Sequence, residues 1–148
     1  MEVGTICQRP VFTIGPFERA SRAAQLLGDS QAGYLVVVEF DPYARPVGVL
    51  SERDIVARVI ARGMDPKAVF VRDIMTANPV MARESDFVEA ALQKMRGFGV
   101  SWLPVVNDYR ELVGILTLED ASSVCADGGS QVRDAAEDEW HVEDVIPV

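Results

Sequence analysis

The chain has 148 residues, of which 49% are hydrophobic, and this is enough for one globular core or two small cores packed together. Its net charge of −9 gives no electrostatic reason to expect nucleic-acid binding, and no apolar run approaches the roughly 20 residues of a membrane span. Two cysteines, one histidine and an N-terminus without a secretory signal argue against a disulfide scaffold or a metal cluster, so we expect a cytoplasmic protein with free thiols.

Each half of the chain predicts the same order of elements, namely strand, helix, strand, turn, strand and helix. In the first half these are a strand opening at Pro10, a helix over 17–27, a buried strand over 35–38, a turn over 39–46, a strand over 47–50 and a helix ending at Gly63. The apolar face of this last helix is predicted to hold Ile55, Val56, Val59 and Ile60.

The second half repeats this order after a linker that includes a helical turn over 71–75. Its elements are a strand opening at Pro79, a helix over 87–95, a strand over 103–106, a turn over 107–111, a strand over 113–116 and a final helix. Pro104 cannot donate to a sheet ladder, so the strand that contains it is predicted either to lie at a sheet edge or to begin late.

The domain boundaries follow the repeat. We expect a first domain over residues 1–65, a linker and second domain over 66–126, and an acidic tail over 127–148. The tail contains seven acidic residues and one arginine, a composition typical of disorder. It also contains Trp140 and several aliphatic residues, which could contact the body, a second copy or another protein.

One short phrase occurs twice. Residues 48–54 read Gly-Val-Leu-Ser-Glu-Arg-Asp, and residues 114–120 read Gly-Ile-Leu-Thr-Leu-Glu-Asp, 66 positions later. Two interpretations fit this phrase. A hydroxyl residue followed three positions later by an acid is typical of a helix capping box. The same helix start could instead bind a nucleotide, with unpaired N–H groups near phosphate and the aspartate accepting from both ribose hydroxyls.

Residues 5–125 resemble a tandem pair of cystathionine-β-synthase (CBS) domains of the stand-alone bacterial type. The segments that carry the resemblance are 48–56, 73–80, 99–106 and 114–120. The resemblance implies an α/β fold of two β-α-β-β-α repeats, packed through their sheets with pseudo-two-fold symmetry. It also implies a homodimer and up to two clefts for an adenosine-containing ligand such as AMP, ADP, ATP, NAD or S-adenosylmethionine.

The resemblance also implies roles for individual residues. Asp54 and Asp120 match the ribose-binding aspartate of the family, and Ser51 and Thr117 match the hydroxyl residue beside it. The adenine pocket is implied to include Asn78, Pro79, Val80 and Val100, with the segment 8–11 in the position of 78–80 in the first repeat.

The two repeats differ beside the aspartate, where Arg53 in the first repeat corresponds to Glu119 in the second. A guanidinium favours phosphate and a carboxylate opposes it, so we expect the Asp54 site to prefer a phosphorylated ligand. The Asp120 site is expected to be empty, or to take adenosine or a metal-bridged nucleotide; the alternative is that Arg53 and Glu119 are only solvated charges on the helix surface. No acid–base or nucleophile constellation indicates an enzyme. We therefore expect a regulatory adenine-nucleotide sensor, read by an unidentified effector protein; the alternative is a structural or protein-interaction CBS pair that binds no ligand.

Overall fold

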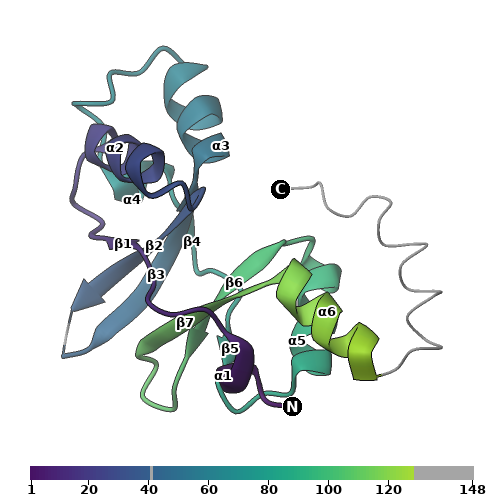
Figure 1. The fold of residues 1–148 in the computed structure, drawn as a ribbon. Helices are drawn as coiled ribbons and strands as arrows, with labels where there is room; N and C mark the ends of the chain where they lie inside the picture. Colours follow the sequence, from purple (N-terminus) through teal and green to yellow (C-terminus); the bar gives the residue numbers. More distant parts are fainter. Residues whose placement is uncertain (41, 129–148) are drawn as a thin grey trace. The chain divides into compact units, whose positions relative to one another are not determined.

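A computed structural model describes residues 1–40 and 42–128 of the chain, which form two compact units (Figure 1). The first-repeat unit contains residues 10–79 and 110–112. The second-repeat unit contains residues 1–9, 80–109 and 113–128. Each unit has a β-sheet and helices, so the predicted α/β class is confirmed. The predicted tail contacts lie outside the described residues.

The first-repeat unit has a four-stranded sheet in the order β1-β2-β3-β4. Strand β1 is parallel to β2, and β2 forms an antiparallel hairpin with β3, which also pairs antiparallel with β4. The elements in chain order are β1 (Thr13–Ile14), α2 (Ala20–Ser30), β2 (Tyr34–Phe40), β3 (Ala44–Ser51), α3 (Glu52–Ile55), the π-helix η1 (Val56–Ile60), α4 (Val71–Ile74) and β4 (Thr76–Ala77).

The core of this unit confirms most of the apolar pattern. The residues of the predicted strand over 35–38 are all at most 1% exposed, and α2 packs its alanines and Leu27 in one core cluster with Leu35 and Val37. The helix after Ser51 differs from the prediction, because Ile55 and Val59 are buried while Val56 and Ile60 are each 59% exposed. The turn of η1 is wider than that of an α-helix, since the N–H of Ala61 bonds the carbonyl of Val56 at 2.8 Å.

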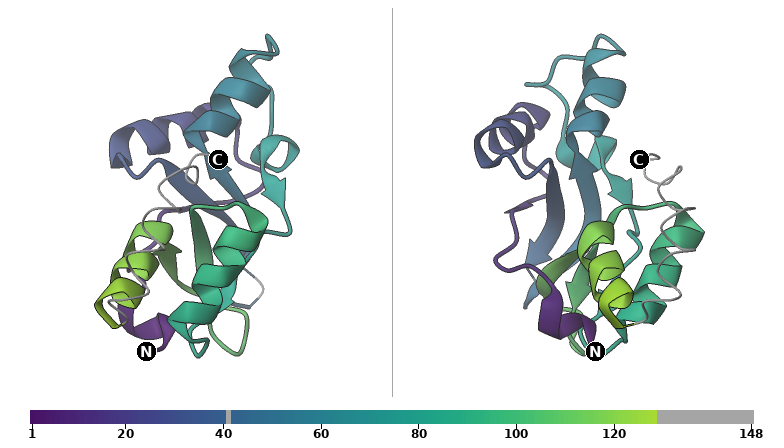
Figure 2. Two further views of the ribbon diagram at one scale, coloured as in Figure 1. Left: turned by 90° about the vertical axis from the view of Figure 1, so that its right-hand side faces the viewer. Right: turned by 45° about the vertical axis from the view of Figure 1, so that its right-hand side comes forward.

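The second-repeat unit has a three-stranded sheet in the order β5-β6-β7, with β5 parallel to β6. Its helices α5 and α6 lie side by side against this sheet (Figure 2). The elements in chain order are α1 (Val3–Ile6), β5 (Ala82–Arg83), α5 (Val88–Phe98), β6 (Trp102–Val106), β7 (Leu112–Thr117) and α6 (Leu118–Gly128). No described helix has the length and apolar content that crossing a membrane requires.

The predicted edge position of Pro104 is wrong, because β6 lies between β5 and β7. Strand β5 is only two residues long and pairs with Val105 and Val106. Pro104 therefore lies beyond the part of β6 that β5 covers, and this explains how an imino acid is tolerated in the middle strand.

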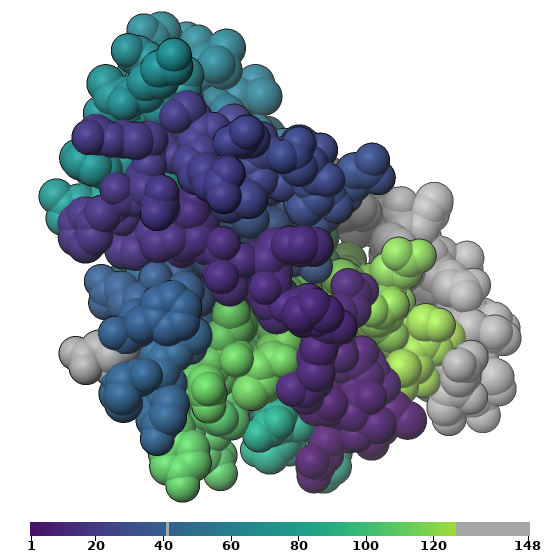
Figure 3. All heavy atoms as spheres, turned by 60° about the vertical axis from the view of Figure 1, so that its left-hand side comes forward, coloured from purple at the N-terminus to yellow at the C-terminus, as the bar shows by residue number. Residues whose placement is uncertain are grey.

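Two short segments of the chain have exchanged places between the repeats. The linker segment (residues 70–78) packs in the first-repeat unit, where β4 pairs with β3. The N-terminal segment (residues 2–8) packs in the second-repeat unit, where the N–H of Gln8 bonds the carbonyl of Ile115 at 2.7 Å. In the space-filling view, the purple N-terminal atoms lie against the yellow-green atoms of this unit (Figure 3).

The exchanged segments explain the glycine that begins each repeated phrase. A Cβ atom on Gly48 would overlap the Sδ atom of Met75, which belongs to the linker segment. A Cβ atom on Gly114 would lie 2.6 Å from the Sγ atom of Cys7, in the N-terminal segment. Both glycines are therefore required for close approach of a neighbouring segment rather than for an unusual backbone conformation.

Candidate functional site

The first repeated phrase forms a complete capping box. Ser51 is the N-cap of α3, and its Oγ accepts from the backbone N–H of Asp54 at 3.3 Å. The Oδ2 atom of Asp54 accepts in return from the Ser51 backbone N–H at 2.8 Å and from the Ser51 hydroxyl at 3.2 Å. The capping interpretation is confirmed here, and it uses only one of the two carboxylate oxygens.

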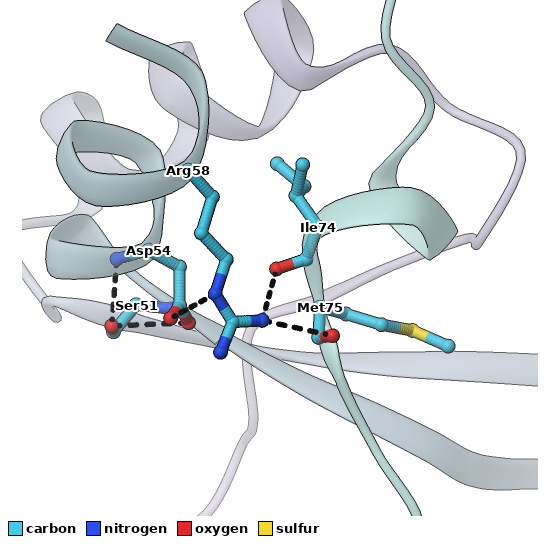
Figure 4. Close-up of polar contacts among 5 residues, drawn as sticks. All are labelled: Ser51, Asp54, Arg58, Ile74 and Met75. Carbon is cyan, nitrogen blue, oxygen red and sulfur yellow. Dashed lines mark hydrogen bonds and ion pairs between the residues drawn. The ribbon is translucent and has the colours of Figure 1, made fainter. Parts of the chain in front are cut away.

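The other oxygen of Asp54 faces an arginine one turn later (Figure 4). The Nε atom of Arg58 lies 3.8 Å from Asp54 Oδ1, and the side chains are 44% and 19% exposed respectively. Nη1 of Arg58 donates to the carbonyl of Ile74 at 2.9 Å and to the carbonyl of Met75 at 3.2 Å. Arg58 therefore joins the carboxylate to the linker segment.

The second repeated phrase makes a related helix start with a different neighbour. The hydroxyl of Thr117 accepts from the N–H of Asp120 at 3.1 Å, as Ser51 does in the first repeat. Asp120 Oδ2 accepts from Nε2 of Gln8 at 2.9 Å. The position four residues after Asp120 is Val124, so no cation corresponds to Arg58.

The predicted nucleotide-binding residues fall in both units. Asn78 and Pro79 belong to the first-repeat unit, whereas Val80 and Val100 belong to the second-repeat unit and pack against its core. Asn78 has a φ of 51°, and its N–H bonds the carbonyl of Val47 at 3.4 Å. The linker segment thus accompanies the Asp54 phrase, while the N-terminal segment accompanies the Asp120 phrase. The sequence predicted the opposite pairing, with segment 8–11 beside Asp54 and segment 78–80 beside Asp120.

The helix starts do not present the row of unpaired N–H groups expected for phosphate. In the first repeat the N–H of Glu52 bonds the carbonyl of Gly33 at 3.3 Å, and the N–H of Asp54 bonds Ser51. In the second repeat the N–H of Leu118 bonds the carbonyl of Ser101 at 2.7 Å. A phosphate group near either phrase would therefore depend on side chains more than on the helix start.

Arg58 was not predicted as functional, and Gln8 was expected in the adenine pocket of the first repeat rather than beside Asp120. The spacing of Asp54 and Arg58 is a sequence signal, because residues four apart on a helix are neighbours. Gln8 offers no such signal, since it is 112 positions from Asp120 in the chain. Arg53 and Glu119 are both exposed, and their predicted influence on ligand choice stays a prediction.

The two cysteines are free thiols, and neither belongs to a metal site among the described residues, where no three His, Cys, Asp or Glu side chains gather. Burial raises the pKa of the Cys7 thiol, although the nearby Arg9 lowers it in part. Burial also raises the pKa of the Cys125 thiol. Neither cysteine has the depressed pKa of a reactive nucleophile.

Comparison with known families identifies two copies of one domain in the chain. A family model described as the CBS domain matches residues 3–61 and 71–127. The chain belongs to the CBS domain family. Each match begins with an exchanged segment, at residue 3 and at residue 71, so both segments are part of the family pattern in this CBS pair.

The relatives of this CBS pair include proteins of different kinds. The Methanopyrus kandleri protein MK0525 is 35% identical over 125 residues, which are 84% of this chain and 62% of that protein. The L-aspartate semialdehyde sulfurtransferase of Methanocaldococcus jannaschii is 32% identical over 81% of this chain and 22% of its own length. The chain therefore spans less than two thirds of these relatives.

Solved structures with this fold include two with bound adenosine compounds. The CBS domain pair of protein MJ0100, in complex with 5′-methylthioadenosine and S-adenosyl-L-methionine, has a TM-score of 0.72 and 29% identity, covering 87% of this chain and 98% of that one. The CBS domain protein PAE2072 from Pyrobaculum aerophilum, complexed with AMP, has a TM-score of 0.73 and 30% identity, covering 81% and 89%.

Proposed function

We propose that this CBS pair is a regulatory module that binds an adenosine-containing ligand at the Asp54 site and catalyses no reaction. The observation that carries the proposal is that the two carboxylate oxygens of Asp54 make different contacts. Its Oδ2 maintains the capping box, while Oδ1 faces the partly exposed Arg58. A carboxylate oxygen has lone pairs for two donors, so Oδ1 can accept ribose hydroxyls while the cap stays formed.

The ligands of two solved relatives, AMP in one and S-adenosylmethionine with methylthioadenosine in the other, support the adenosine moiety as the common element. ADP, ATP and NAD share it and are equal candidates. The linker segment beside Asp54 brings Asn78 and Pro79 to this unit, and this supports their proposed place in the adenine pocket.

The experiment is a titration of the whole chain with adenosine, AMP, ADP, ATP, NAD and S-adenosylmethionine, followed by calorimetry and by thermal shift. A ligand that binds only the native state raises its stability by mass action. Asp54→Ala should abolish binding at this site. Asp29→Ala removes an exposed acid of the same unit and should bind as the wild type does. Wild-type protein that binds none of the six compounds would refute the proposal.

A second candidate function concerns only the second repeat, which would bind no ligand. The contact from Gln8 engages one oxygen of Asp120, and Val124 gives this site no cation. These observations favour a second repeat that contributes packing and partner contacts. The same titrations test this candidate, because Asp120→Ala should then leave binding unchanged.

We also propose a homodimer, supported by exposed apolar side chains at and after η1. Val56 and Ile60 are each 59% exposed and Met64 is 41% exposed, on adjacent turns. Sedimentation should show a dimer for the wild type and a shift towards monomer for Ile60→Glu, with Lys67→Glu as the control. A cytoplasmic location, supported by two free thiols, and an effector protein that reads the bound state complete the proposal.

A further inference from the structure

We propose that Arg58 is the residue that recognises a ligand phosphate at the Asp54 site. This inference rests on the proposed function and adds a specificity to it: the site should prefer phosphorylated adenosine ligands because of Arg58, whose side chain is already held in position by the linker segment.

The first step of the argument is the orientation of the guanidinium. Both hydrogen bonds to the carbonyls of Ile74 and Met75 use Nη1, at 2.9 and 3.2 Å. Nε points instead towards Asp54 Oδ1, at 3.8 Å (Figure 4). Because a guanidinium is planar, fixing Nη1 on one side places the edge formed by Nε and Nη2 on the side of the carboxylate.

The second step is the chemistry of that edge. Two parallel N–H groups on a guanidinium match two oxygens of a phosphate group, and such charge-assisted pairs are about twice as strong as neutral hydrogen bonds. A ribose held by Asp54 carries its phosphate on the 5′ carbon, and Arg58 is a cation next to Asp54. Arg58 can therefore bind the phosphate without giving up the carbonyls of the linker segment.

The third step is preorganisation. A long arginine side chain ordinarily loses rotamer freedom when it binds, but the contacts to Ile74 and Met75 have already restricted Arg58. The helix start offers little competition, since the N–H groups of Glu52 and Asp54 already have acceptors. The second repeat has Val124 at the corresponding position, so this recognition is specific to the first repeat.

The test compares affinities for AMP and adenosine, measured by calorimetry on the whole chain. In the wild type AMP should bind more tightly than adenosine, and Arg58→Gln should reduce this preference by about tenfold or more while adenosine affinity stays close to wild type. Arg58→Lys, which keeps the charge but loses the planar fork, should fall between them. Adenosine binding serves as the folding control for each variant.

Two further variants separate Arg58 from its neighbours. Arg62→Gln removes an exposed charge just beyond η1 and should leave the preference unchanged. If Arg53→Gln removes the preference and Arg58→Gln does not, the inference is overturned in favour of Arg53. If AMP and adenosine weaken equally in Arg58→Gln, phosphate recognition by Arg58 is refuted while the proposed function stands. Wild-type protein that binds neither compound overturns the inference, and the proposed function falls with it only if the other four compounds also fail to bind.

Discussion

Replacing Gly48 with alanine should destabilise the first-repeat unit. The added Cβ would overlap Met75 Sδ, lie 2.9 Å from Met75 Cγ and lie 3.1 Å from the carbonyl oxygen of Thr76. The methionine side chain can rotate, but the carbonyl is fixed because Thr76 is paired with Val49 in the sheet. Rotation would also remove Met75 from the core that it contacts.

The expected magnitude follows from two opposing terms. Overpacking of this kind costs about 1–3 kcal/mol, whereas replacing glycine restricts the unfolded chain and returns about 0.4–1 kcal/mol. The net loss in the free energy of unfolding should be about 1–2 kcal/mol. Urea denaturation monitored by circular dichroism should show this as a lower midpoint at an unchanged slope.

The control is Gly28→Ala in α2 of the same unit. An added Cβ there would have no heavy atom within 4 Å, so this variant should be equal to or more stable than the wild type. The cost of Gly48→Ala should shrink in a Met75→Ala background, because the overlapping side chain is gone. Equal stability of Gly48→Ala and Gly28→Ala, or a cost that Met75→Ala does not change, would refute the packing argument.

Two further predictions concern the second-repeat unit. If the second repeat binds no ligand because Gln8 engages Asp120, Gln8→Ala should create adenosine binding at that site, and adding Asp120→Ala should abolish it. Calorimetry that shows binding equal to wild type in Gln8→Ala would contradict this competition between Gln8 and a ribose. The raised pKa values of Cys7 and Cys125 should make alkylation at pH 8 slower than in urea, and equal rates would contradict this. Because the folded pKa lies above the ordinary value of 9.0, the associated stability is present below about pH 9 and is lost as the pH rises through the folded pKa.

Local patterns in the sequence were sufficient for the repeat, the buried strands and the caps. The apolar run over 35–38 and the Ser51–Asp54 spacing each depend on neighbouring residues, so short-range rules apply to them. The exposure of Val56 and Ile60 could not be read in this way, because four apolar residues on one helix do not reveal which of them the sheet covers.

Short-range rules could also not predict which chain segment contacts each of the two aspartates. Strand β4 is two residues long, and a pairing this short leaves almost no periodic signal in the sequence. Whether Asp54 meets the linker segment or the N-terminal segment is decided by the path of the chain between the repeats. The Arg58 contact was predictable in part, since its spacing from Asp54 is local but its two carbonyl acceptors are not.

The exchange of segments has a consequence for dissecting this protein. A fragment ending at residue 65 would retain Asp54 but lose α4 and β4, and a fragment beginning at residue 66 would retain Asp120 but lose α1 and Gln8. A cut after residue 79 would keep Asp54, Arg58, α4 and β4 in one fragment, but it would still separate Gln8 from Asp120. A change in linker length would therefore alter the surroundings of the first aspartate, even though most of that repeat precedes the linker in the chain.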